Sequence, residues 1–402
     1  MPPNRPANRN NTLQDVEQAD PDTVTRAFLT YVREQQAHRS LLAPAESLNP
    51  LTVAAAHDDQ VPPGFRHHNS VPAIAPHFPN ISSALGLGHR KVVKPDIMMP
   101  GGKERLHMRS TRPLILRHTD VAQGCGLRCA APDPTNRGDL TRRTLSCGTS
   151  PATALASRAA HQIFDSMMDV DGGSHLSEIP PEYWPVVVKA LLVHSAKWPE
   201  ASALIGDVFG PAGTRAHLVA ERMTNVPRLI GYGTPSVPRV MDCSPSQATL
   251  VGYGEISPKY AHEYRVPLPQ CLERVVEPRT IILTLAWLSP VSNAHLDYRR
   301  AQLLIDAPSH REAIGVRRLV GQQPSDHASK RGSLVHEIYT GEDAVVFIED
   351  GHLVLRVWCR ERPSSLRLRE TIRYGLAVTI EAGEALPVYE QINLRLRAPI
   401  VP

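Results

Sequence analysis

The feature that most constrains this 402-residue sequence is a serine placed where a helix is expected to begin. It is Ser150, within the run Gly-Thr-Ser-Pro-Ala-Thr-Ala at residues 148–154. Proline disfavours helical backbone angles at the preceding residue and suits the first helical position, so we expect Ser150 to be the N-cap. Its hydroxyl group would then lie beside free backbone amides, at the positive end of the helix dipole. Such amides can stabilise an oxyanion, although serine is also a common N-cap without any catalytic role.

The residues after the serine predict a helix with one apolar face. Ala152, Ala156, Ala159, Ile163 and Met167 recur at helical spacing, with small side chains near the serine and larger ones farther along. The small side chains allow the first turns of this helix to lie close to a sheet. We therefore expect the start of the helix to be held rigidly.

A second motif, Lys-Pro-Asp-Ile-Met-Met-Pro-Gly-Gly, occupies residues 94–102. In this order the two segments resemble the subtilisin-like serine proteases (subtilases), whose nucleophile lies in a Gly-Thr-Ser-x-Ala-Thr stretch preceded by Lys-Pro-Asp-x-x-x-Pro-Gly. The resemblance implies a serine endopeptidase with Ser150 as nucleophile and Gly148 and Thr149 in the substrate and oxyanion region. It implies a polypeptide substrate and neither a cofactor nor a metal.

Other segments extend the resemblance from about residue 44 to about residue 254. They are the strand-like stretch at 47–59, the Ile-Ser-Ser-Ala-Leu-Gly-Leu-Gly stretch at 81–88 and the Gly-Tyr-Gly-Thr-Pro turn at 231–235. This extent corresponds to only the C-terminal part of a subtilase catalytic domain. The fold class that it implies is α/β, with the C-terminal portion of a subtilisin-like parallel-sheet domain followed by an antiparallel β-sandwich domain.

The sequence departs from the family pattern in its catalytic groups. Pro151 replaces the usual methionine and Ala154 replaces a common proline, but neither change removes a reacting group. In contrast, we find no Asp-Ser-Gly or Asp-Thr-Gly strand end, no His-Gly-Thr helix start and no Ala-Gly-Asn segment. Loss of the histidine of such a triad costs about 10⁶-fold in turnover.

Two hypotheses follow from the missing triad residues. In the first, the sequence is truncated or forms part of a split enzyme, and a separate chain carries the Asp/His half of the triad. In the second, the protein is a catalytically inactive, protease-derived module that binds peptides or proteins.

No histidine of the sequence has the local context of the family's catalytic base. The histidines upstream of Ser150 include His57, His67, His68, His77 and His89, and none of these five lies in a stretch like the family's histidine helix. The pair at 67 and 68 falls in a proline-rich loop, and no third ligand stands at metal-binding spacing. Asp169, Asp171 and Gly172 lack the further acidic ligands of a calcium loop. His194, on the apolar face of a helix expected at about 185–197, is predicted to be a hydrogen-bonded core residue.

Composition narrows the class of protein. With 44 Lys and Arg against 40 Asp and Glu and with 5% aromatic residues, the sequence shows no basic stripe for nucleic acid. No apolar run has the ~18 residues of a membrane span, and the first five residues lack the apolar core expected of a secretory signal. The six cysteines form no disulfide framework, and Cys125 with Cys129 lacks a partner pair for zinc. A reducing, cytoplasmic location is therefore favoured, with Cys147 as an unactivated thiol near Ser150.

The chain divides into three segments by pattern. Residues 1–19 contain almost no apolar side chains and are expected to be disordered. Residues 20–262 form the partial subtilase-like α/β domain, starting with an amphipathic helix that Asp20 caps and that ends near His38. Residues 263–402 alternate apolar and polar side chains and predict the β-sandwich domain, with a hairpin at Asp350-Gly351 and a last strand at about 392–397.

Overall fold

The structure of the chain is a computed structural model. It describes residues 20–59, 70–72, 74–109, 115–119, 126–136, 138–169, 175–211, 213–241, 244–294, 298–306, 314–347, 351–362, 368–383 and 386–397. The predicted disorder of residues 1–19 and the expectations for His67, His68, Cys125, Asp171 and Asp350 lie outside these residues. The described part is a mixed helix and strand structure with several sheets.

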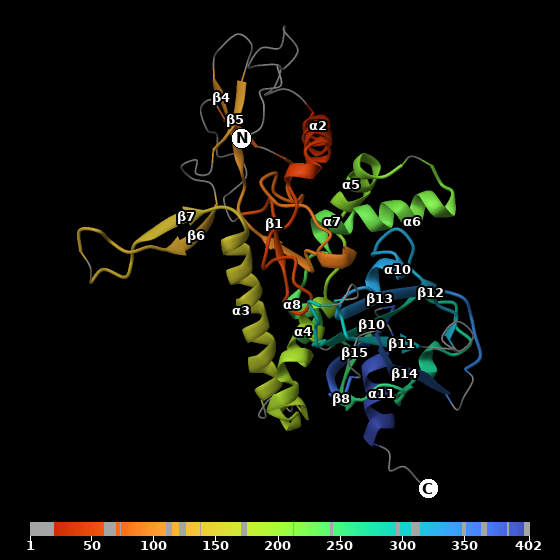
Figure 1. Ribbon diagram of the computed structural model, residues 1–402. Coiled ribbons are helices and arrows are strands. Elements are labelled where there is room, and N and C mark those ends of the chain that lie inside the picture. The colour runs from red at the N-terminus through yellow and green to blue at the C-terminus, as the bar shows by residue number, and fades with distance from the viewer. Residues whose placement is uncertain are drawn as a thin grey trace.

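The N-terminal helix α2 (Pro21–Glu34) begins as predicted, because the Asp20 carboxylate accepts a hydrogen bond of 3.0 Å from the Thr23 amide. Its buried residues Leu29 and Val32 pack against Ile205 of helix α5 (Ala201–Phe209) and its neighbours. A short 3-10 turn, η1 (Gln36–His38), follows it. The apolar face of α2 therefore covers a second helix of the same N-terminal region (Figure 1).

One parallel strand pair lies at the centre of this region. Strand β1 (Val53–Ala56) pairs with β3 (Ile97–Pro100), and β1 is buried over residues 54–56. Helix α3 (Thr149–Met168) packs across both strands with the predicted face, since Ala152, Ala156, Ala159, Ile163 and Met167 are all buried. Within the described residues the parallel sheet has only these two strands.

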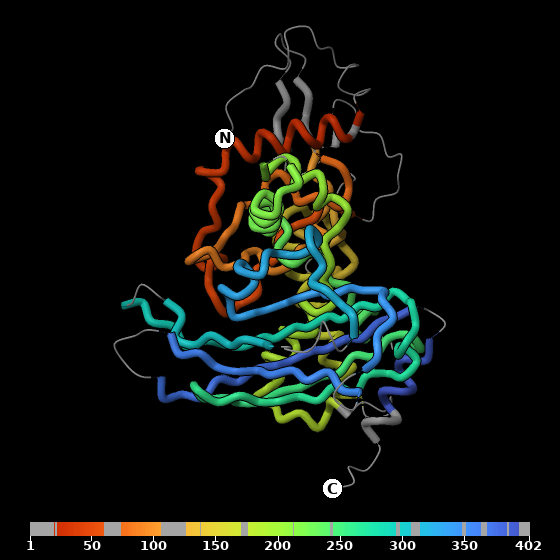
Figure 2. Tube along the Cα trace, turned by 90° about the vertical axis from the view of Figure 1, so that its right-hand side faces the viewer, coloured from red at the N-terminus to blue at the C-terminus, as the bar shows by residue number. Residues whose placement is uncertain are grey.

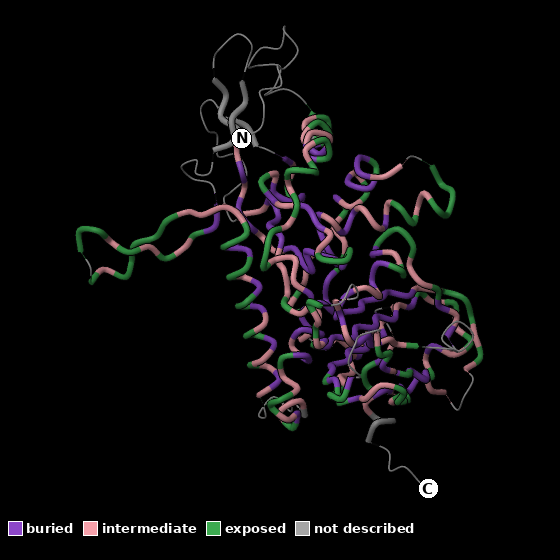
Figure 3. The backbone as a smooth tube through the Cα atoms, in the orientation of Figure 1, coloured by how far each residue is buried: buried purple, intermediate pink, exposed green. Residues whose placement is uncertain are grey.

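The N-terminal region also contains two small antiparallel sheets. Strands β2 (Ser70–Pro72), β4 (Arg105–Arg109) and β5 (Ile115–Thr119) form one small sheet. Strands β6 (Leu127–Ala130) and β7 (Arg143–Ser146) form an arm that projects from the body just before α3 (Figure 1). Many residues along this arm are exposed, in contrast with the buried face of α3 (Figure 3).

Helix α4 (Trp184–His194) joins the two halves of the molecule. It packs between α3 and two strands, β10 (Arg279–Trp287) and β15 (Ile372–Ala382). A Cβ atom at Gly375 would lie 2.7 Å from the Val186 carbonyl oxygen, so only glycine allows this close approach of helix and sheet. The remaining helical elements of this region are η2 (His89–Lys91), η3 (His175–Glu178), η4 (Pro181–Tyr183), α6 (Ala216–Asn225), α7 (Pro227–Ile230) and α8 (Val237–Met241).

Two antiparallel sheets dominate the C-terminal region (Figure 2). The five-stranded sheet has the order β12 (Arg317–Arg318), β13 (Leu334–Gly341), β10, β15 and β8 (Gln247–Ile256). The three-stranded sheet has the order β11 (Ala301–Asp306), β14 (His352–Glu361) and β9 (Ala261–Pro267). Leu283 and Leu285 of β10 share one core with Leu353 and Leu355 of β14, as their alternation predicts. The short elements η5 (Gln270–Leu272) and α10 (Asp326–Ser329) lie in connections.

One expectation for the C-terminal region is wrong. The last element is a helix, α11 (Val388–Arg397), in place of a strand. Val388 and Ile392, four residues apart, are both buried in the shared core, and a short apolar run of this kind fits either a helical or a strand period. Strands β13 and β14, which lie on either side of the residues where the hairpin was expected, belong to different sheets.

A buried polar network connects α4 to the five-stranded sheet. The His194 ring nitrogens lie 2.8 Å from the Thr284 hydroxyl and 2.7 Å from the Thr379 hydroxyl. The Thr284 hydroxyl also lies 2.8 Å from Nδ1 of His336. Burial lowers the pKa of His336 to about 4 and the pKa of His194 well below its usual value. His194 is thus a hydrogen-bonded core residue, as predicted.

None of the helices that the structure describes has both the length and the apolar character that a membrane crossing requires.

The neutral histidines of this network predict acid sensitivity. The pKa of His336 is lower in the folded protein than in the unfolded chain, so the unfolded chain binds more protons as the pH falls from 6.5 towards 4. Stability is therefore retained above pH 6.5 and lost below it, and His336 alone accounts for about 2 kcal/mol between pH 7.5 and 5. Urea unfolding at both pH values should show a smaller loss for His336→Gln than for the wild type. The exposed His161→Gln serves as the control, and equal losses in both variants would contradict this account.

Candidate active site

The two sequence motifs meet at a contact between their glycines. The Gly148 amide donates a hydrogen bond of 2.7 Å to the Gly101 carbonyl oxygen. Gly101 lies so close to β1 that a Cβ atom there would be 2.4 Å from the Cβ atom of Ala55. The loop of residues 94–102 therefore holds the start of α3 close to strand β1.

Gly148, and not Ser150, is the N-cap of α3, which corrects the prediction. Its backbone has φ +115 and ψ −166, a conformation essentially restricted to glycine. Thr149 and Ser150 are the first two helical residues, and Pro151 occupies the third. Proline is tolerated there because the first-turn amides have no helical partner and the ring meets no preceding turn. The tight glycine turn starts the helix earlier than the proline alone suggested.

Ser150 is exposed at the rim of a cleft. The cleft has a volume of about 1080 Å³, and its walls come from the start of α3, the β1 segment, the Ser82–Ala84 stretch and the end of α2 with η1. No side chain caps the first turn of α3, so the amides beside Ser150 stay available to a ligand. Gly148, Thr149 and Ser150 all line this cleft, which brings the three sequence-predicted site residues together.

Cys147 also lines the cleft, but its thiol lies against backbone. Its Sγ is 3.4 Å from the Lys103 carbonyl oxygen and close to Gly102 and Gly126. The thiol therefore packs against the loop that carries Lys103.

No carboxylate lines the cleft within the described residues. Asp96 of the Lys-Pro-Asp motif is buried, with one carboxylate oxygen 2.6 Å from Lys94 Nζ and 2.7 Å from the Thr52 amide. The hydrogen bond from Thr52 ties the segments before β1 and β3 together. Asp96 thus has a structural position and is not a partner for Ser150.

His57 lies at the end of β1 but is buried. Its Nδ1 is 3.1 Å from the Glu104 amide nitrogen and 3.2 Å from the side-chain oxygen of Asn80. Burial lowers the pKa of His57 to about 4, so the imidazole is neutral at pH 7. His57 thus connects the end of β1 to the segments that carry Asn80 and Glu104.

The other upstream histidines that the sequence drew attention to lie elsewhere. His77 is on the surface, 3.6 Å from the Asp58 carboxylate, and His89 packs edge-on against Tyr298 at a ring distance of 4.9 Å. The described residues contain no group of three or more His, Cys, Asp or Glu side chains that fits a metal ion.

His38 is the one histidine among the described cleft-lining residues, and it belongs to none of the family motifs. It is exposed at the end of η1, across the cleft from the start of α3. Only its place just after the first amphipathic helix signals it in the sequence. In the described part of the chain, no hydrogen bond joins Ser150 to His38 or to any carboxylate.

Comparison with known proteins identifies the family. The subtilase family model (peptidase S8) matches residues 14–233. The match includes α2, so the expectation that only a C-terminal part of the catalytic domain, from about residue 44, resembles the family is wrong at its N-terminal limit. Leu29 and Val32 of α2 pack into the same core as β1, which gives a physical reason for the longer match.

The chain is also 24% identical over 275 residues to the uncharacterized protein y4bN of Sinorhizobium fredii. That alignment covers 65% of this chain and 54% of the relative, so the chain spans about half the length of the curated relative that it matches. Because the family match covers more than half of the sequence, this protein belongs to the subtilase family.

Proposed function

We propose that this protein is a serine-type endopeptidase that hydrolyses peptide bonds with Ser150 as nucleophile. The observation that carries the proposal is the position of Ser150, exposed at the start of α3 in a cleft, with the two family motifs in contact beside it. The amides of the first turn of α3, with Gly148 and Thr149, would bind the oxyanion that forms during acyl transfer. The finer fold assignment, a subtilisin-like parallel sheet over 20–262 and a β-sandwich over 263–402, stays a prediction.

The base that activates Ser150 is proposed to come from outside this sequence. A serine hydroxyl is a weak nucleophile at neutral pH and needs a base within hydrogen-bond reach. His57 and His194 are buried and hydrogen-bonded elsewhere, and no carboxylate of the described residues lines the cleft. We therefore infer that another segment or chain supplies the Asp/His half of the triad.

The direct test is reaction with a fluorophosphonate probe. We expect the chain alone to react at least about 10³-fold more slowly than the chain mixed with a polypeptide that supplies the Asp/His motifs, because the chain alone lacks the base. The Ser150→Ala variant should not react in either sample. The Ser157→Ala variant, changed about two helical turns farther along α3, should react like the wild type. Reaction that survives Ser150→Ala would reject Ser150 as the nucleophile.

His38 offers a way to test where the base comes from. If the base is supplied from outside, His38→Ala should change the labelling rate of the complemented protein by less than about 10-fold, since the residue would act only through binding. A loss close to the ~10⁶-fold expected for a triad histidine would assign the base to His38 and contradict an external source. The residue is exposed, so the variant should fold, which circular dichroism can verify.

Gly148 is expected to matter for stability and for labelling alike. An alanine there has open space, but it must adopt φ +115, which costs roughly 1–3 kcal/mol. Urea unfolding should show this loss for Gly148→Ala, together with slower labelling because the start of α3 shifts. Gly138→Ala in the exposed connection between β6 and β7 is the matched control. A Gly148→Ala variant as stable and as reactive as the wild type would contradict the assigned turn geometry.

The second candidate function is a protease-derived module that binds peptides or proteins without cleaving them. The absence of a hydrogen-bonded base at Ser150 in the described part of the chain favours it. It predicts peptide binding that Ser150→Ala leaves unchanged. Peptide turnover that Ser150→Ala abolishes would exclude it.

A further inference from the structure

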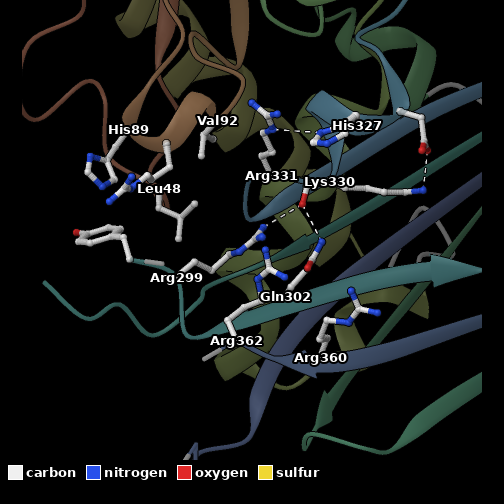
Figure 4. Close-up of a pocket in the computed structure, with 13 residues that line it drawn as sticks. Leu48, His89, Val92, Arg299, Gln302, His327, Lys330, Arg331, Arg360 and Arg362 are labelled. Carbon is white, nitrogen blue, oxygen red and sulfur yellow. Dashed lines mark hydrogen bonds and ion pairs between the residues drawn. The ribbon is translucent and has the colours of Figure 1, made fainter. Parts of the chain in front are cut away.

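A second pocket lies where the subtilase-matched region meets the C-terminal sheets. It has a volume of about 400 Å³ and shares no lining residue with the Ser150 cleft. Leu48, Val92 and the η2 turn with Arg90 form one wall. The other wall comes from the start of β11, the α10 segment and the end of β14 (Figure 4). A ligand held there would contact both regions of the molecule.

The pocket, which we call the cationic pocket, carries a strong positive charge. Six cationic side chains line it: Arg90, Arg299, Lys330, Arg331, Arg360 and Arg362. Asp326 is the one carboxylate among its described lining residues, and it pairs with Lys330 at 2.6 Å. No carboxylate of the described residues pairs with Arg90, Arg331 or Arg360. Cations crowded in one concave site repel each other unless an anion is present.

Several of these side chains are held in place by the fold. Arg299 is only 7% exposed, and its Nη1 donates hydrogen bonds of 3.0 and 2.8 Å to the carbonyl oxygens of Lys330 and Gly332. Gln302 donates to the same Lys330 carbonyl oxygen at 2.9 Å. These bonds fix the backbone on either side of Arg331, whose side chain extends from this segment (Figure 4).

Arg331, which is half-buried, and Arg360, which is exposed, are positioned by weaker contacts. Arg331 Nε lies 3.3 Å from His327 Nδ1, and the Arg360 guanidinium lies 5.3 Å from the centre of the Trp358 ring. Neither contact uses all five N–H donors of the guanidinium group, so each arginine keeps donors for a ligand. The pocket also has an uncharged wall, which can contact an uncharged part of a ligand. It is formed by the side chains of Leu48 and Val92 and by the rings of His89 and Tyr298.

We propose that the cationic pocket binds a small phosphorylated molecule through its phosphate groups. The planar guanidinium fork matches phosphate oxygens in pairs, and several arginines from different elements match a ligand with more than one anionic group. Phosphate groups carry up to two charges each and therefore balance this many cations within a small volume. This site is separate from the proposed peptidase chemistry at Ser150.

Isothermal titration of the full chain with tripolyphosphate tests the proposal. We expect saturable binding with one site per chain that weakens as salt is raised, because the contacts are ionic. Arg331→Gln and Arg360→Gln should each lower the affinity by about 10-fold or more, since each removes a charge-assisted hydrogen bond. Arg158→Gln, an exposed arginine on α3, is the matched control and should bind like the wild type.

Three results would overturn the proposal. They are the lack of saturable binding, equal loss of affinity in Arg158→Gln, and binding of citrate as tight as that of tripolyphosphate, which would reject the phosphate assignment. Arg360 is exposed, so its variant is expected to fold and gives an answer even if Arg331→Gln is unstable. Titration of Ser150→Ala should match the wild type, so the outcome is independent of the labelling experiments.

Discussion

The hydrogen bond between the Gly148 amide and the Gly101 carbonyl oxygen fixes the geometry on which the candidate active site depends. It joins two loops that are far apart in the sequence, and its geometry depends on glycine at both positions. Gly101 must lie against Ala55 of β1, and Gly148 must adopt a backbone angle that other residues avoid. From that point α3 runs across the β1–β3 pair on an alanine-rich face, which leaves Ser150 at the exposed end of a rigid helix.

Helix α4 connects the N-terminal region to the C-terminal sheets through buried hydrogen bonds. Lys189, in the middle of the helix, is buried, and its ammonium group donates to the Asn49 carbonyl oxygen at 2.8 Å and to the Ser333 hydroxyl at 3.0 Å. It thus connects the segment before β1 to the segment before β13. On the next turn His194 binds two threonine hydroxyls of the five-stranded sheet. Polar groups buried in this way are satisfied only in one arrangement, which fixes how helix and sheet meet.

The elements that the sequence predicted correctly are those with strong local signals. The Asp20 cap starts α2, the spacing from Ala152 to Met167 gives the buried face of α3, and the strand-like stretch at 47–59 contains β1. These signals depend on propensity and period, which act within one element. The three site residues that the Gly-Thr-Ser motif indicated also line one cleft.

The errors came where tertiary packing decides between local alternatives. The run at 388–397 fits both periods, and burial of Val388 and Ile392 in the shared core selects the helix. The N-cap is Gly148 and not the predicted Ser150, because the contact with Gly101 fixes where the chain enters helix α3. His38 and the cationic pocket could not be predicted, since their residues come from segments that only the fold brings together.

The most direct test of the central claim is to locate the covalent adduct formed by a fluorophosphonate. After labelling of the complemented protein, trypsin should release the peptide of residues 144–158, which carries Ser150 together with Cys147, Thr149 and Ser157. The account predicts that fragmentation mass spectrometry places the phosphonyl group on Ser150. An adduct on another residue of this peptide, or on a different peptide, would contradict it.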